Sequence, residues 1–173
     1  VKDLLAVSRV PRGLAEINKE ELDIAAIVPG AIEQVRPLLD MKRHELRLEP
    51  WEQPLHASGD RTRLVQVVSN ILNNAAKYTP PGGRIVVRFG SEGEEAVISV
   101  RDNGQGIEPQ MLPYIFDLFT QAERTPDRSQ GGLGIGLALV KSLVALHGGR
   151  VAAFSGGPDK GSEFVMRLPL LSG

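Results

Sequence analysis

The sequence is organised around Gly131–Leu137, GGLGIGL, which runs directly into the apolar helical pattern Ala138–Leu146. Four glycines in six residues, with leucine and isoleucine between them, do not resemble a linker, because linkers rarely alternate glycine with bulky apolar residues. Glycine lets a backbone approach a ligand closely, and the free N–H groups of a helix start attract anions. The motif therefore indicates either a phosphate-binding loop or a tight turn with close packing.

This motif matches neither of the two commonest nucleotide-binding loops. A P-loop needs Gly-Lys-Ser/Thr in succession, whereas here Lys141 and Ser142 follow Val140. A Rossmann loop needs G-x-G-x-x-G after a first strand, and this stretch comes late in the chain.

The composition indicates one globular domain, since 42% of the 173 residues are hydrophobic. The net charge of −1 gives no support for nucleic-acid or anionic-membrane binding, and the absence of cysteine excludes disulfides and thiolate metal sites. The three histidines, His44, His56 and His147, lack the spacing of metal ligands. No apolar run approaches the ~20 residues of a membrane span.

Hydrophobic periodicity predicts an α/β chain in which amphipathic helices cover a sheet with one apolar face, a two-layer sandwich. Asp23 and Asp60 are expected to cap helices, and Pro29 predicts a kink or a late start in the first of them. The predicted helices are Ile24–Arg43, Thr62–Tyr78, Pro109–Phe116 and Ile135–His147. The predicted strands are His44–Leu48, Leu55–Ser58, Arg84–Phe89, Ala96–Asp102, Arg150–Ser155 and Glu163–Leu168.

The helix Thr62–Tyr78 carries an unusual polar face. Its apolar side comprises Leu64, Val67, Val68, Ile71, Leu72 and Ala75. Its opposite side comprises Arg63, Gln66, Asn70, Asn73, Asn74 and Lys77. This side could be an ordinary solvated face, but asparagine is a mediocre helix former that competes with the backbone. Three asparagines within five residues therefore favour a binding surface.

Asp102 ends the predicted strand Ala96–Asp102 on the face that points to the core. A carboxylate in such a row is costly to bury without a partner, and such positions are enriched in functional sites. The alternative is a strand-end aspartate that reaches water or caps the next turn. Asn103–Ile107, NGQGI, follows at once, and the polar stretch Asp117–Gln130 is longer than a usual connection.

Taken in order, five motifs resemble the N, G1, F, G2 and G3 boxes of the catalytic and ATP-binding domain of sensor histidine kinases. The motifs are Asn70-x3-Asn74-Ala-x-Lys77-Tyr78, Asp102-x-Gly104-x-Gly106, Phe116-x2-Phe119, Gly132-x-Gly134-x-Gly136 and Gly161-Ser162-x-Phe164. The resemblance covers roughly residues 20–170. It implies the Bergerat ATP-binding fold, shared with type II topoisomerases, MutL and the heat-shock chaperone ATPase. This is an α+β sandwich whose mixed, mostly antiparallel sheet is covered on one face by about three helices.

The resemblance also implies roles for individual residues. Asp102 is expected to accept a hydrogen bond from the exocyclic amine of adenine, which selects ATP over GTP. Asn74 is expected to place its amide oxygen on Mg²⁺, which prefers oxygen ligands. Asn70 and Lys77, one turn before and after Asn74, are expected near the phosphates and complete the catalytic set. The other residues expected to contact the nucleotide are Tyr78, Gly104, Gly106, Ile107, Phe119, Gly132, Leu133, Gly134, Ile135, Gly136, Leu137 and Ser162. Asp117–Gly131 corresponds to an ATP lid, with Phe116 and Phe119 as its hinge packing.

Two features depart from the simplest expectation. In hydrolytic relatives a glutamate four residues before the magnesium asparagine acts as general base, and Asn70 occupies that place here. An amide cannot take a proton at neutral pH, which favours transfer over hydrolysis, although some kinases of the group carry glutamate there. His44-Glu45 superficially resembles the phosphoacceptor pair, but the family places that pair in a helix before residue 1. His147 lies at a helix end, where a contact with the helix dipole explains it.

The implied function is transfer of the γ-phosphoryl group of ATP, with Mg²⁺, to a histidine on a dimerisation domain outside this sequence. The implied partners are that domain, in the same or the partner protomer of a homodimeric parent, and the receiver domain of a response regulator. No nucleic acid or membrane contact is expected of this stretch. The domain is expected to be cytoplasmic, in a parent that an inner-membrane anchor could hold. Residues 1–18 are expected to end the dimerisation helix and its linker, and 19–173 to form the catalytic domain.

Two alternatives remain open to test. One is a degenerate regulatory or interaction module of the same fold, against which the intact motifs argue. The other is an ATPase of the topoisomerase type, which Asn70 and the lack of a transducer domain disfavour.

Overall fold

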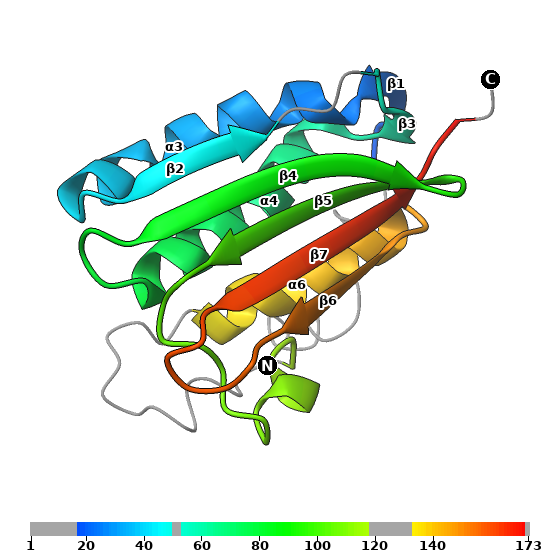
Figure 1. Ribbon diagram of the computed structural model, residues 1–173. Coiled ribbons are helices and arrows are strands. Elements are labelled where there is room, and N and C mark those ends of the chain that lie inside the picture. The colour runs from blue at the N-terminus through cyan, green and yellow to red at the C-terminus, as the bar shows by residue number, and fades with distance from the viewer. Residues whose placement is uncertain (1–16, 50–52, 118–132, 172–173) are drawn as a thin grey trace.

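The computed structural model describes residues 17–49, 53–117 and 133–171. Its main sheet has five strands in the order β2-β4-β5-β7-β6, with β2 parallel to β4 and every other pair antiparallel. The strands are β2 (Glu45–Glu49), β4 (Arg84–Glu92), β5 (Glu95–Asp102), β6 (Arg150–Phe154) and β7 (Ser162–Pro169). Figure 1 shows the helices α3, α4 and α6 of the described residues lying against one face of this sheet. The predicted two-layer α+β sandwich is confirmed.

The helices are α3 (Val28–Met41), α4 (Arg61–Tyr78) and α6 (Leu133–Leu146). The late start of the first helix is confirmed, because residues Ile24–Ile27 form a 3₁₀ turn, η1, before α3 begins. Both predicted caps are present: Asp23 Oδ1 accepts from the N–H of Ala25 at 3.1 Å, and Asp60 Oδ1 accepts from the N–H of Arg63 at 3.2 Å.

A short strand that the periodicity did not predict, β1 (Glu20–Asp23), pairs antiparallel with β3 (His56–Gly59). The two strands form a separate two-stranded sheet. Asp23 also accepts from the N–H of Leu55 at 3.1 Å, so the cap that starts η1 fixes the chain entering β3 as well.

Two predicted elements differ in the structure. The helix predicted over Pro109–Phe116 is only a 3₁₀ turn, η2 (Leu112–Tyr114), since a short segment interrupted by Pro113 cannot sustain α-helical hydrogen bonding. The last helix begins at Leu133, two residues before the predicted start, so Gly134 lies in its first turn together with Gly136.

The core lies between the helices and the inner face of the sheet. The α4 residues predicted to be apolar, from Leu64 to Ala75, are buried there, together with Ile85, Val87 and Val100 of the strands. None of the helices in the described ranges combines the length and hydropathy that crossing a bilayer requires.

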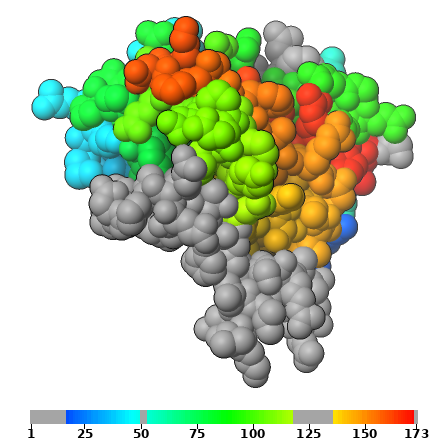
Figure 2. Space-filling model, turned by 90° about the horizontal axis from the view of Figure 1, so that it is seen from below, coloured from blue at the N-terminus to red at the C-terminus, as the bar shows by residue number. Residues whose placement is uncertain are grey.

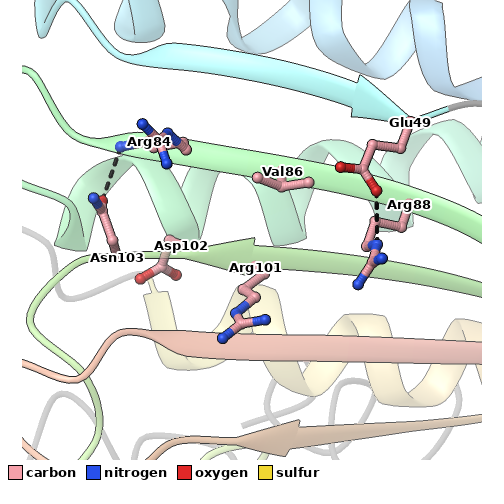
Figure 3. A pocket seen from close by; sticks show the side chains of 7 residues that line it. All are labelled: Glu49, Arg84, Val86, Arg88, Arg101, Asp102 and Asn103. Carbon is pink, nitrogen blue, oxygen red and sulfur yellow. Dashed lines mark hydrogen bonds and ion pairs between the residues drawn. The ribbon is translucent and has the colours of Figure 1, made fainter.

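The outer face of the sheet, toward the viewer in Figure 1, has none of the described helices on it. Ion pairs cross between its strands, including Arg88 Nε to Glu49 Oε1 at 2.8 Å and Arg84 Nε to Glu45 Oε1 at 3.3 Å. A pocket of about 380 Å³ opens on this face, and Figure 3 draws its lining side chains. It is lined by Glu49, Arg84, Val86, Arg88, Arg101, Asp102 and Asn103.

Candidate functional site

The asparagine-rich face of α4 is only partly exposed to solvent. Asn74 is only 6% exposed, and Asn70, Asn73 and Lys77 are half-buried. A buried amide such as that of Asn74 must bond to something other than bulk water. The role of this face as a binding surface stays a prediction.

Asn74 has a buried side-chain oxygen, Oδ1, that accepts no hydrogen bond from the described part of the chain. Leaving a buried acceptor without a donor costs about 1–3 kcal/mol, which is uncommon unless a ligand completes the site. An amide oxygen is a ligand type that Mg²⁺ accepts, and this ion usually takes few protein ligands together with substrate phosphates. Among the described residues there is no group of three or more His, Asp or Glu that could hold a metal alone. Asn74 thus fits the role of a magnesium ligand.

Asn70 connects α4 to the start of α6. Its Nδ2 donates to the carbonyl oxygen of Gly136 at 3.5 Å, and a Cβ added at Gly136 would lie 4.0 Å from the same nitrogen. The N box and the last glycine of the opening motif, separated by 66 residues, are therefore neighbours.

Asp102 lies on the inner face of β5 and is 6% exposed. Its Oδ1 accepts from the N–H of Gly104 at 2.9 Å, and its Oδ2 accepts from the hydroxyl of Ser162 at 2.8 Å. The predicted burial is confirmed, and Asp102 also caps the next turn, which was the alternative to a functional site. Two carboxylate oxygens offer about four acceptor positions, so this arrangement leaves room for a further donor.

The glycines after Asp102 bring backbone segments together. A Cβ on Gly104 would lie 2.4 Å from the carbonyl oxygen of Tyr78, and the N–H of Gln105 donates to that same oxygen at 3.0 Å. Gly106, at φ +77°, packs in the same way against the carbonyl oxygen of Gly157. Figure 2 shows the segment after β5 (yellow-green) against the turn between β6 and β7 (orange). These contacts give both glycines a packing role, and their contact with a base stays a prediction.

Ser155 holds this turn between β6 and β7. Its hydroxyl accepts from the N–H of Ile107 at 3.0 Å and donates to the carbonyl oxygen of Gly161 at 2.7 Å. The sequence gave no signal for Ser155, because a serine at the end of a strand is common and its partners are distant in the chain.

Part of the predicted site lies outside the described residues. This applies to Phe119, to Gly132, to nearly all of the expected lid Asp117–Gly131, and to the side chains of Leu133 and Ile135. Among the rest, Leu137 is buried in the core, and Phe116 packs edge-to-face on Phe164 with ring centroids 6.0 Å apart. The predicted hinge packing of Phe116 therefore has a core partner.

The geometry unites Asn70 with Gly136, and the end of α4 with Gly104, Asp102 and Ser162. A family model described as "Histidine kinase-, DNA gyrase B-, and HSP90-like ATPase" matches residues 59–172. The chain belongs to this family. The match spans all the elements that carry the described site, from the Asp60 cap of α4 to β7.

Individual sensor proteins are also similar to the chain. The chain is 33% identical over 170 residues to the alginate biosynthesis sensor protein KinB of Pseudomonas aeruginosa, and 36% identical over 177 residues to the sensor histidine kinase TrcS of Mycobacterium tuberculosis. These alignments cover 98% and 99% of this chain but 28% and 33% of those proteins. The chain therefore spans about a third or less of the length of these relatives.

Solved structures of histidine kinases are also similar to this chain. The mycobacterial sensor histidine kinase MprB is 31% identical with a TM-score of 0.75, covering 90% of this chain and all of that one. Full-length ShkA in complex with AMPPNP is 27% identical with a TM-score of 0.79, covering 99% of this chain and 35% of ShkA. The chain is the catalytic, ATP-binding domain of a two-component sensor histidine kinase.

Proposed function

We propose that this domain binds ATP with Mg²⁺ between α4, α6 and the end of β5, and transfers the γ-phosphoryl group to a histidine on a dimerisation domain outside this chain. The observation that carries the proposal is the buried, unpartnered Oδ1 of Asn74 on the helix face that also bears Asn70 and Lys77. The solved complex of ShkA with AMPPNP, an ATP analogue, supports nucleotide binding by a protein of the same fold.

The base end of the nucleotide is assigned to Asp102. Its carboxylate is already oriented by Gly104 and Ser162, so an adenine amine meets an acceptor whose direction is fixed. Guanine carries an oxygen in place of that amine, and two acceptors facing each other exclude it.

The phosphate end is assigned to Asn70, Asn74 and Lys77 on α4 and to the first turn of α6. Mg²⁺, when bound, neutralises phosphate charge and orients the phosphates. Lys77 supplies a protein cation on the same face, and the backbone of the Gly134–Gly136 turn offers N–H groups near a helix start. Asn70 cannot remove a proton from water, which favours a phosphoryl acceptor other than water.

Phosphoryl transfer requires mainly positioning and charge stabilisation, so this domain needs no nucleophile of its own. The acceptor histidine, the dimerisation domain that carries it and the receiver domain of a response regulator are accordingly proposed as partners. KinB and TrcS are sensor proteins about three times as long as this chain, which leaves room for such domains in a parent. Residues 1–18 are proposed to be the end of the dimerisation helix.

The test is radioactive phosphate transfer from γ-labelled ATP to an added dimerisation domain of the parent. We expect labelling of its histidine in the presence of Mg²⁺ and little labelling of this chain alone. The Asn74→Ala and Lys77→Met variants serve as controls, because both are expected to label the acceptor poorly. Tight ATP binding without any transfer would indicate the degenerate module instead. Steady phosphate release without an acceptor would indicate an ATPase.

A further inference from the structure

The C-terminal end of α4 is held by side chains from another part of the chain. The helix ends at Tyr78, and Thr79 already has extended dihedral angles (φ −105°, ψ 123°). The last carbonyl groups of a helix have no partner within it, so they need water, caps or other segments. Here the turn between α3 and β2 provides hydrogen-bond donors for these carbonyl groups. The donors are the side chains of two basic residues, Lys42 and His44, which we call the α3–β2 clamp.

Lys42 binds two consecutive carbonyl groups. Its Nζ donates to the oxygen of Ala76 at 2.8 Å and to the oxygen of Lys77 at 3.1 Å. These are charge-assisted bonds at the negative end of the helix dipole, where a cation is favourable. The Lys42 side chain is half-buried, and burial lowers its pKa below the ordinary lysine value.

His44 binds the next part of the chain. Its Nε2 donates to the oxygen of Thr79 at 2.8 Å and lies 3.2 Å from the oxygen of Pro80. The remaining carbonyl of this stretch, that of Tyr78, accepts from the N–H of Gln105. Every carbonyl oxygen from residue 76 to residue 80 therefore has a partner outside α4.

Backbone hydrogen bonds fix the clamp itself. The N–H of Gly82 donates to the oxygen of Lys42 at 2.8 Å, and the N–H of Glu45 donates to the oxygen of Gly83 at 2.8 Å. The α3–β2 turn and the turn after α4 thus lock each other, and β2 continues from there in parallel with β4.

This arrangement bears on the site because the carbonyls of Ala76 and Lys77 belong to the last turn of α4. Fixing the peptide groups on either side of Lys77 fixes the direction in which its side chain leaves the helix. Ala76, the first residue whose carbonyl group Lys42 binds, lies two positions after Asn74. Catalytic groups that bind phosphates depend on such positioning, and a displacement of about 1 Å can cost on the order of 100-fold.

We infer that Lys42 and His44 are positioning residues, which set the last turn of α4 so that Lys77 and Asn74 meet the phosphates of bound ATP. The inference rests on the proposed function of that face. It also gives a role to His44, whose pairing with Glu45 resembled a phosphoacceptor motif in the sequence.

The test compares Lys42→Met with the native chain by calorimetry, using ATP with Mg²⁺ and, separately, adenosine. We expect the variant to bind ATP with Mg²⁺ on the order of 10-fold more weakly, whereas adenosine affinity changes less than about 2-fold. Lys42→Arg, which keeps the cation and the donors, should restore most of the affinity. A purely structural role would not separate the two ligands in this way.

The matched control is His147→Leu. His147 contacts the other end of α4, where its Nε2 accepts from the N–H of Asp60 at 3.1 Å, so its loss loosens the helix away from Lys77. We expect unchanged affinity for ATP with Mg²⁺ in the folded variant. An equal loss in both variants, or full affinity in Lys42→Met, overturns the inference.

Two further measurements separate this inference from the proposed function. If Lys77→Met and Asn74→Ala bind ATP with Mg²⁺ like the native chain, the proposed phosphate site is wrong. If those two lose affinity and Lys42→Met does not, only the positioning role fails. Should Lys42→Met not fold, His44→Asn tests the other half of the clamp with the same two ligands and the same criteria.

Discussion

Asp102 and Ser162 face each other at the ends of β5 and β7, and the serine hydroxyl donates to the aspartate Oδ2 at 2.8 Å. Their neighbours Arg101 and Glu163 are also paired in register, and they leave the strands on the opposite, outer face. Two successive rungs of the sheet thus carry a polar pair on the inner face and two oppositely charged residues on the outer face.

Ser162→Ala removes one of the two hydrogen bonds that orient the Asp102 carboxylate. We expect ATP affinity to fall about 2- to 10-fold, because a typical hydrogen bond contributes about 0.5–1.5 kcal/mol. Calorimetry on the folded variant measures this, with Ser162→Thr as the control that keeps the hydroxyl. Native affinity in the alanine variant would show that Gly104 alone orients Asp102.

Asp102→Asn replaces one of the two acceptor oxygens by an NH2 group, which donates and cannot accept. We expect ATP affinity to fall on the order of 10- to 100-fold, since hydrogen bonds to charged groups contribute about 1.5–3 kcal/mol. The preference for ATP over GTP should shrink in parallel, which competition between the two nucleotides measures. If the native chain binds both equally, Asp102 does not read the base.

Asn74→Ala separates stability from binding. Because the Oδ1 of Asn74 has no partner in the described residues, its removal should change the free energy of unfolding by less than about 1 kcal/mol. Affinity for ATP should meanwhile lose its dependence on Mg²⁺. Urea unfolding and calorimetry with and without Mg²⁺ give the two values. A large loss of stability would mean that the amide is structural.

Gly104→Ala places a Cβ 2.4 Å from the carbonyl oxygen of Tyr78. Since backbone cannot yield as a side chain does, we expect a loss of about 1–3 kcal/mol in the free energy of unfolding. The control is Gly30→Ala within α3, where the nearest atom to the new Cβ is 3.9 Å away. That change should be neutral or stabilise the helix by up to about 1 kcal/mol. Equal effects at both glycines would contradict the close packing of Gly104.

His147 makes stability depend on pH. Burial lowers the pKa of this imidazole, and the nearby Lys19 lowers it further, while the Leu143 carbonyl and Asp60 act in the opposite direction. The neutral ring donates from Nδ1 to Leu143 and accepts at Nε2 from Asp60. The unfolded chain binds a proton at His147 near the ordinary pKa of about 6.5. The contribution of this residue to the free energy of unfolding is therefore present above that pH and is lost as the pH falls.

Urea unfolding between pH 5 and pH 8 measures this contribution, at about 1.4 kcal/mol for each unit by which the pKa is lowered. His147→Gln should flatten the slope below pH 6.5, because it removes the buried imidazole. The same slope in native and His147→Gln chains would assign the pH dependence to another group.

The sequence predicted what repeats with a regular period and missed what depends on distant partners. The alternation in β5 placed Asp102 on the buried face correctly, and the wheel of α4 separated its two faces. By contrast, β1 is rich in charged residues and forms only because β3 pairs with it, so no local pattern predicts this strand. β4 runs on to Glu92 because Gly90 and Ser91 are paired with β5, although neither residue favours a strand.

The site shows the same division. Residue types and spacing indicated Asn70, Asn74, Lys77 and Asp102, because amides on a helix and an acid in an apolar row are locally unfavourable. The contact of Lys42 with Ala76 spans 34 residues and joins a lysine at the end of one helix to carbonyls at the end of another. Neither the lysine nor the carbonyl groups are unusual in sequence, so the contact cannot be predicted without the fold.

Because α4 is anchored at its first residues by His147 and at its last by Lys42, neither terminus is free to fray. Its amide protons should then exchange with deuterated water only when the entire domain opens, at a rate shared with the central strands. ATP would meet a preformed helix, and most of the ordering entropy on binding must come from elsewhere in the molecule.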